Sequence, residues 1–220
     1  MDQPNDPVAD RARQRVGITL KEKWQLDDLV GVGGMAAVYS ATHRNGMRVA
    51  VKMLHPHFVE DSTVLARFRR EAEVTGRLGS EHIVQILDVD EDDGNPFLVL
   101  ELLEGESLAH RIKHRGALDG KQVAAIVDQI ASALELAHRA GVVHRDLKPE
   151  NIGVDRRGRA VIVDFGLARQ PMTSEPICDA PSSPPDRTVT NHGTVVGTRR
   201  YMAPEQAAGE AADTRSDVYA

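Results

Sequence analysis

The segment from His144 to Asn151, which reads HRDLKPEN, constrains this chain more than any other stretch. It places a carboxylate (Asp146), a cation (Lys148) and an amide (Asn151) within one short loop. A second carboxylate, Asp164, follows Asn151 by thirteen residues at the end of an apolar run. A proton acceptor, a cation and hard oxygen ligands at this spacing are the groups that phosphoryl transfer needs. The alternative, that both aspartates only cap turns, requires these groups to coincide by accident.

Two upstream segments extend the pattern. The first, GVGGMAAV over residues 31–38, lies between two strand-like runs, and its last residue is fourteen positions before Lys52 of VAVK. Glycines let backbone N–H groups approach phosphates that a Cβ would block, although glycine clusters also form ordinary hairpin turns. A lysine in an apolar strand needs a charged partner to stay ordered. The order of the segments favours a phosphate site.

Together these segments resemble the signature set of eukaryotic-like serine/threonine protein kinases, and the glycine-rich loop is most similar to the bacterial branch. The resemblance covers residues 24–220 and implies a kinase domain truncated within its C-lobe. It implies an α+β fold of two lobes. The N-lobe, about 24–100, would hold an antiparallel sheet and one helix. A hinge at about 101–104 would lead to a mainly helical, incomplete C-lobe over 105–220.

The resemblance also implies roles for single residues. Asp146 would be the catalytic base, and Lys148 would neutralise charge on the transferring group. Thr198 would bond to both, and together with Lys148 it indicates serine/threonine rather than tyrosine specificity. Asn151 and Asp164 would be ligands of Mg²⁺.

ATP would be held mainly by Lys52, paired with Glu71 nineteen residues further on. Glu71 could instead pair with Arg67 or Arg70 on the surface of its own helix. The other expected ATP contacts come from the glycine-rich segment, the strand that carries Lys52, and the hinge. They are Val30, Gly31, Val32, Gly33, Gly34, Met35, Ala36, Ala37, Val38, Ala50, Glu101 and Leu103.

The chain departs from the family pattern at two of these places. Ala36 stands where a third glycine is usual, so we expect a slightly stiffer loop. Gly153 stands where a bulky apolar residue is common on the floor of the adenine site, so we expect looser adenine packing.

Periodicity predicts further local structure. Residues 62–78 read as a helix with Ser62 as its cap, and Asp119 with Gln122 predicts a capping box for a helix over 121–140. The buried stripe of the second helix would be Val123, Ile126, Val127, Ile130, Leu134 and Ala137. Residues 1–23, polar and charged, are expected to form a mobile leader.

Composition excludes several classes of protein. The net charge of −6 gives no basic field for nucleic acid. The single cysteine, Cys178, allows no internal disulfide and fits a reducing compartment such as the cytoplasm. No apolar run reaches the 18 or so residues of a membrane span. The expected partners are protein substrates and, for autophosphorylation, a second copy of the chain.

The segment between Gly166 and Thr198 is long and carries five prolines within residues 171–185. Thr190 or Thr194, when phosphorylated, would pair with the arginine before the catalytic aspartate and switch activity on. The alternative is that these threonines only solvate a loop.

Three interpretations remain open from the sequence. The first is an active Mg·ATP-dependent serine/threonine kinase. The second is an ATP-binding regulatory module, and the third is an impaired fragment that lacks the C-terminal helices. Intact catalytic residues favour the first interpretation. Asp217 matches the family residue that holds the backbone of the catalytic loop.

Overall fold

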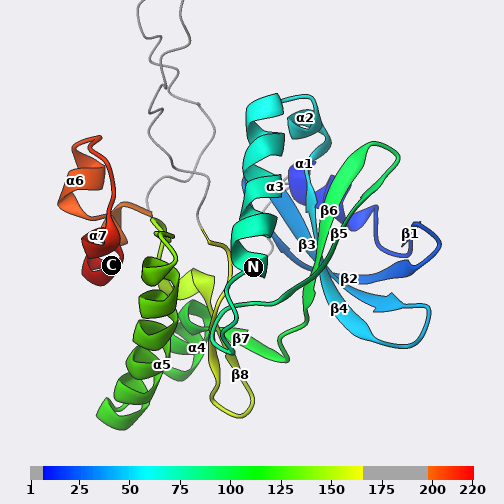
Figure 1. Cartoon of the computed structure of the whole chain (residues 1–220). Helices are drawn as coiled ribbons and strands as arrows, with labels where there is room; N and C mark the ends of the chain where they lie inside the picture. Colours follow the sequence, from blue (N-terminus) through cyan, green and yellow to red (C-terminus); the bar gives the residue numbers. More distant parts are fainter. Residues whose placement is uncertain (1–6, 166–197) are drawn as a thin grey trace, which may run out of the picture.

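The computed structural model describes residues 7–165 and 198–220 and arranges them in two lobes (Figure 1). The first lobe contains an antiparallel sheet of six strands in the order β1-β2-β3-β4-β6-β5. Its elements are α1 (Pro7–Arg13), β1 (Thr19–Leu20), β2 (Trp24–Val32), β3 (Ala36–His43), β4 (Arg48–Leu54), α2 (Pro56–Val59), α3 (Ser62–Gly76), β5 (Ile86–Asp92) and β6 (Asn95–Glu101).

The second lobe begins with a small antiparallel sheet in the order β7-β8-β9, packed with helices. Its elements are β7 (Gly105–Ser107), α4 (Leu108–Arg115), α5 (Gly120–Arg139), η1 (Pro149–Asn151), β8 (Ile152–Asp155), β9 (Ala160–Ile162), η3 (Thr198–Tyr201), α6 (Pro204–Ala207) and α7 (Thr214–Tyr219). The predicted α+β fold of two lobes is confirmed.

Strand β4 is buried along almost its whole length because a hydrophobic core covers each face of the sheet. On one face Val49, Val51 and Met53 share a core with Ala12 of α1. On the other face Leu54 packs with Phe68 of α3. This double cover explains why the VAVK strand is apolar at consecutive rather than alternate positions. It also leaves Lys52 as the one charged side chain buried in β4.

Residues 7–20 lie within the segment that we expected to be a mobile leader, but here they form α1 and β1. Ala12 is buried against the sheet, and the hydroxyl of Tyr39 donates a hydrogen bond to the Ala12 carbonyl at 3.0 Å. Leu20 is buried as well, and β1 extends the sheet beside β2. The polar composition of this segment did not predict the contact with the sheet, because only a few apolar side chains form that contact.

The two long helices begin within one residue of their predicted starts. The predicted cap of α3 is corrected by the structure. Helix α3 starts at Ser62, but its cap is Asp61, whose carboxylate accepts from the amides of Thr63 and Val64. Asp61 is a better cap than Ser62 because its carboxylate also interacts favourably with the helix dipole. The capping box of α5 is confirmed.

In α5 the predicted buried stripe is partly wrong. Ile126, Ile130, Leu134 and Ala137 are buried, whereas Val123 and Val127 are 44% and 58% exposed. The small sheet contacts only one side of the helix, so the stripe is wider than the surface that covers it.

Gly105 provides a stability prediction, because a Cβ there would lie 2.1 Å from the Val154 carbonyl oxygen of the neighbouring strand. Gly105→Ala is expected to destabilise the chain by about 1–3 kcal/mol through this overlap. Urea unfolding measures the change. Gly76→Ala, at the open end of α3, is the control and should be neutral or slightly stabilising. Equal stability of the two variants would contradict the prediction.

Candidate active site

The loop that follows α5 brings the predicted catalytic groups together. Lys148 Nζ lies 2.7 Å from Asp146 Oδ2, and both side chains are about a quarter exposed or less. The Asn151 amide donates to the Asp146 carbonyl at 2.9 Å and to its carboxylate at 3.3 Å. These donations use the nitrogen of Asn151 and leave its side-chain oxygen as the atom that could bind a metal. Pro149 at the start of η1 makes the loop turn immediately after Lys148.

Asp217 of α7 holds the backbone of this loop. Its side chain is fully buried and accepts from the amides of His144 at 2.8 Å and Arg145 at 2.7 Å. His138 at the end of α5 adds a third contact, 2.8 Å from the same carboxylate. Arg145 has a φ of +68°, a left-handed conformation that a non-glycine residue keeps only when its surroundings enforce it. The predicted role of Asp217 toward the loop backbone agrees with this geometry.

His144 is fully buried beneath the site, and its ring centroid lies 5.0 Å from that of Phe165. Burial lowers the pKa of His144, although the carboxylates of Asp217, Asp146 and Asp164 oppose the shift. The amide of Asp146 donates to His144 Nδ1 at 3.3 Å, which fits a neutral ring. A neutral imidazole therefore supports the catalytic loop from below.

The lowered pKa of His144 predicts a pH dependence of stability. Between the folded pKa and the unfolded value of about 6.5, the unfolded chain binds the extra proton. Stability is therefore lost as the pH falls below about 6.5, by at most about 1.4 kcal/mol per pH unit from this group. His144→Phe should flatten that slope in urea unfolding measured at several pH values. The exposed His114, replaced by Gln, is the control, and an unchanged slope in His144→Phe would contradict the assignment.

A second ion pair joins the two lobes. Lys52 Nζ of β4 lies 2.6 Å from Asp164 Oδ1, which follows β9. The Lys52 side chain is 11% exposed, whereas that of Asp164 is 50% exposed and faces the cleft. Loss of water alone would raise the pKa of Asp164, but the charge and hydrogen bond of Lys52 lower it below its usual value. Asp164 thus presents an ionised and partly accessible carboxylate, a group that could bind a metal ion.

The predicted ATP contacts are distributed over both faces of the first sheet. In the β3–β4 register Val38 lies opposite Lys52, and Ala50 is two residues before it on the same strand. Ala37, which was predicted as an ATP contact, lines a different cavity with Tyr39. Neighbouring residues of a strand point to opposite faces, so the side chains of Ala37 and Val38 lie on opposite sides of the sheet. The ATP contacts of this segment stay predictions.

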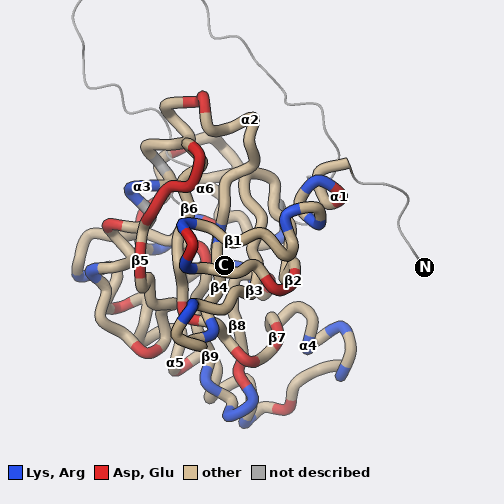
Figure 2. Tube along the Cα trace, turned by 90° about the vertical axis from the view of Figure 1, so that its right-hand side faces the viewer, with Lys and Arg blue, Asp and Glu red and all other residues tan. Residues whose placement is uncertain are grey.

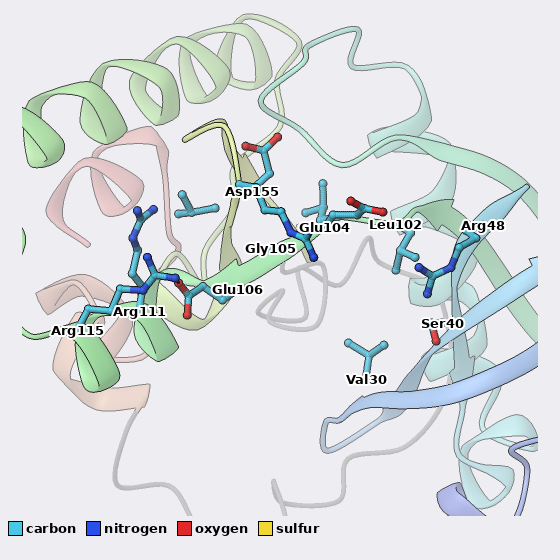
Figure 3. A pocket seen from close by; sticks show the side chains of 13 residues that line it. Val30, Ser40, Arg48, Leu102, Glu104, Gly105, Glu106, Arg111, Arg115 and Asp155 are labelled. Atoms are coloured by element: carbon cyan, nitrogen blue, oxygen red, sulfur yellow. The ribbon is translucent and has the colours of Figure 1, made fainter.

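A cavity of about 690 Å³ lies in front of the hinge between the lobes (Figure 3). Val30 and Leu103, both predicted ATP contacts, line it together with charged residues that the sequence reading missed: Arg48, Glu104, Glu106, Arg111, Arg115, Asp155 and Arg156. Figure 3 shows Arg111 and Arg115 beside Glu106. Neither Lys52 nor Asp164 lines this cavity, and we call it the outer mouth.

Glu106 is held on one side of that mouth. His110 Nδ1 lies 2.8 Å from its carboxylate and Arg115 lies 2.7 Å from it. The hydrogen bond from His110, with the charge of Arg115, lowers the pKa of Glu106. No sequence motif marked this cluster, since its members are neighbours only because β7 leads directly into α4.

Gly153 has a local explanation. A Cβ at this position would lie 2.8 Å from Cδ1 of Leu103 in the hinge. The leucine side chain therefore fills the space that a larger residue at 153 would occupy. The expectation of looser adenine packing stays a prediction.

Several predicted residues are only partly described. Glu71 lies on α3 and Thr198 at the start of η3, but their side chains are outside the described part of the chain. Cys178, Thr190 and Thr194 fall in residues 166–197, which the structure does not describe. The pairing of Lys52 with Glu71 and the contacts of Thr198 remain predictions.

Three supporting residues were not predicted. His138 contacts Asp217, as described above, and Gln206 of α6 donates to the Arg145 carbonyl at 2.8 Å. Behind the hinge, Arg159 bonds to Glu101 at 3.1 Å and to Asp155 at 3.3 Å. Each bridges segments that are distant in the sequence, so no local pattern could reveal it.

The fold and the site together define the protein-kinase class. The fold has two lobes, and Lys52 pairs with Asp164 between them. A second pair, Asp146 with Lys148, lies on a loop whose backbone bonds to Asp217. The chain belongs to the protein kinase family, whose profile, described as "Protein kinase domain", matches residues 24–220.

Serine/threonine-protein kinases of bacteria are among its curated relatives. It is 40% identical over 214 residues to the serine/threonine-protein kinase PknH of Mycobacterium bovis, covering 97% of this chain and 34% of that protein. It is 42% identical over 198 residues to PknD of Mycobacterium tuberculosis, covering 90% of this chain and 28% of that protein. A solved structure of the M. tuberculosis PknI kinase domain superposes with a TM-score of 0.66 at 29% identity and covers 92% of this chain and 70% of that one.

The chain thus spans about a third of the length of these curated relatives. In the part of the chain that the structure describes, no helix is long and apolar enough to cross a membrane.

Proposed function

We propose that this chain transfers the γ-phosphate of Mg·ATP to serine or threonine hydroxyls of proteins. The observation that carries the proposal is the placement of Asp146 between Lys148 and Asn151, on a loop whose backbone Asp217 fastens. A carboxylate that is already oriented needs little reorganisation to accept a proton during the reaction.

The residues present fit a magnesium nucleotide. Asp164 offers an ionised, half-exposed carboxylate, and Asn151 offers its amide oxygen. Both are hard oxygen donors of the kind that Mg²⁺ prefers. Lys52 is placed to bind phosphate oxygens. Mg²⁺, when bound, would neutralise charge on the phosphates.

The proposed roles on the acceptor side follow from charge. Asp146 orients the substrate hydroxyl and takes its proton as the new P–O bond forms. Lys148, 2.7 Å from this carboxylate, is close enough to balance the negative charge that shifts to the transferred group. Neither role needs a metal-bound nucleophile.

Mass spectrometry of the chain after incubation with Mg·ATP and a serine peptide tests this function. Phosphate on the chain or the peptide, absent when EDTA removes magnesium, supports a kinase. Saturable binding of a fluorescent ADP analogue without any transfer would instead favour the ATP-binding regulatory module. Neither binding nor transfer by a folded chain would favour the impaired fragment.

Autophosphorylation of the segment before Thr198 is part of the proposal. It is supported by Arg145, whose Nε and Nη1 atoms are buried and have no hydrogen-bond partner in the described part of the chain. A buried guanidinium without an acceptor is costly, and a phosphate would supply the missing oxygens.

The double variant Thr190→Ala, Thr194→Ala is accordingly expected to lower kcat for the peptide by about tenfold or more, because it removes charge-assisted hydrogen bonds to Arg145 of about 1.5–3 kcal/mol. Steady-state kinetics after preincubation with Mg·ATP gives the measurement. Thr173→Ala, in the same segment, is the control. Unchanged turnover in the double variant would refute the switch while leaving the kinase activity itself in place.

A further inference from the structure

A second cavity, of about 470 Å³, lies in the first lobe between α1, the sheet and α2. We call it the α1 cavity. Its floor is apolar and buried, formed by Ala37, Tyr39, Met53 and Leu54. A volume of this size falls within the usual range of small-molecule sites. None of the proposed catalytic or metal-binding residues lines it.

The wall that α1 contributes is basic. Arg11 and Arg15 line the cavity, whereas the third arginine of this region, Arg13, pairs with Asp10 at 2.9 Å. Figure 2 shows basic residues gathered on the α1 segment, in contrast to the acidic run along β5. Among the described lining residues Glu60 is the one acidic side chain, so with Arg11 and Arg15 the fixed charges of these residues sum to +1.

The guanidinium groups of Arg11 and Arg15 form no ion pair with the described residues. Nη1 of Arg15 lies 3.7 Å from the sulfur of Met53, a weak acceptor, and no ion pair of Arg11 is found among the described residues. A guanidinium offers five N–H donors in a planar fork that fits carboxylate, sulfonate or phosphate oxygens. The tyrosine on the floor is already engaged, because its hydroxyl donates to Ala12. The guanidinium groups of Arg11 and Arg15 are therefore available to bind an anion.

The opposite wall is shared with the glycine-rich turn. His55 lines the cavity, and its Nε2 bonds to the Gly33 carbonyl at 2.8 Å. The amide of the same residue donates to the Met35 carbonyl at 2.9 Å. His55 thus holds the turn through both its side chain and its backbone, and a ligand in the cavity would press on this residue.

We propose that the α1 cavity is a binding site for a small organic anion: a carboxylate, sulfonate or phosphate monoester carried on an apolar body such as an aromatic ring. The anionic group meets Arg11 and Arg15, and the apolar body lies over Tyr39 and Met53. Because His55 links this cavity to the glycine-rich turn, the bound anion changes the position of that turn.

Methionine methyl groups labelled with ¹³C report on this site by NMR. Met53 lies on the cavity floor, Met35 lies in the glycine-rich turn, and the exposed Met47 is a distant reference. The probe is phenyl phosphate, with inorganic phosphate and benzyl alcohol as the anion and the ring alone. We expect phenyl phosphate to shift Met53 and Met35 saturably and to leave Met47 in place. Each half alone should bind about tenfold more weakly or worse, because inorganic phosphate loses the apolar contact with the floor and benzyl alcohol loses the contact with the arginines.

The matched variants separate this site from any other. Arg11→Gln with Arg15→Gln should weaken phenyl phosphate binding at Met53 by about tenfold or more and remove the shift of Met35, whereas Arg13→Gln should change neither. An unmoved Met53, equal binding of inorganic phosphate, or full binding by the double variant would overturn the site. A Met53 shift that leaves Met35 unmoved would overturn its link with the turn.

Discussion

Asp146→Asn is expected to lower kcat for phosphoryl transfer to a serine peptide by about 10²–10⁴-fold, the range that a general base contributes. The amide keeps the shape of the carboxylate but cannot take the proton of the hydroxyl. The Asn151 amide also donates to the backbone carbonyl of residue 146, and this hydrogen bond should survive because it does not involve the substituted side chain. The KM for ATP should therefore change little, which is the pattern of an interaction made only in the transition state.

Initial-rate kinetics with varied ATP and peptide separates these quantities. Asp128→Asn, which makes the same chemical change on the exposed face of α5, is the control. Thermal unfolding of both variants shows whether the fold is intact. Retention of most of the wild-type kcat by a folded Asp146→Asn chain would remove this residue from the mechanism.

Asp217→Ala is expected to cost about 2–5 kcal/mol of stability, because it leaves two buried backbone N–H groups, those of His144 and Arg145, without an acceptor. The left-handed conformation of Arg145 would then relax, and Asp146, the next residue, would leave its position beside Lys148. We therefore expect kcat to fall together with stability. Asp217→Asn should be intermediate, because its amide keeps one acceptor oxygen.

Urea unfolding measures the loss of stability, and hydrogen exchange of the His144 and Arg145 amides reports the local effect. Asp213→Ala removes the cap of the same helix and should cost about 0.5–2 kcal/mol without touching the loop. If those two amides kept full protection in Asp217→Ala, Asp217 would not be what holds the catalytic loop.

The candidate catalytic groups could be predicted because they lie in short segments of the sequence. The groups at 146, 148 and 151 lie within six consecutive residues, so a loop of any conformation would keep them near one another. The capping box at Asp119 and Gln122 was likewise predictable, since both partners belong to one turn. Spacing alone says less about Ala37, whose side chain lines the α1 cavity; its predicted contact with ATP stays a prediction.

The sequence by itself determined the family, the residues that we propose as the base and the two oxygen ligands, and the division into a β-rich and a helical lobe. All of these depend on residue type and on spacing over short distances. Only the tertiary structure decided that α1 docks on the sheet, that Arg159 ties the hinge to β9, and that His138 contacts the carboxylate of Asp217. Each of these contacts joins segments that are distant along the chain. Which segments meet depends on how all the apolar faces are covered at once, and no local pattern records that result.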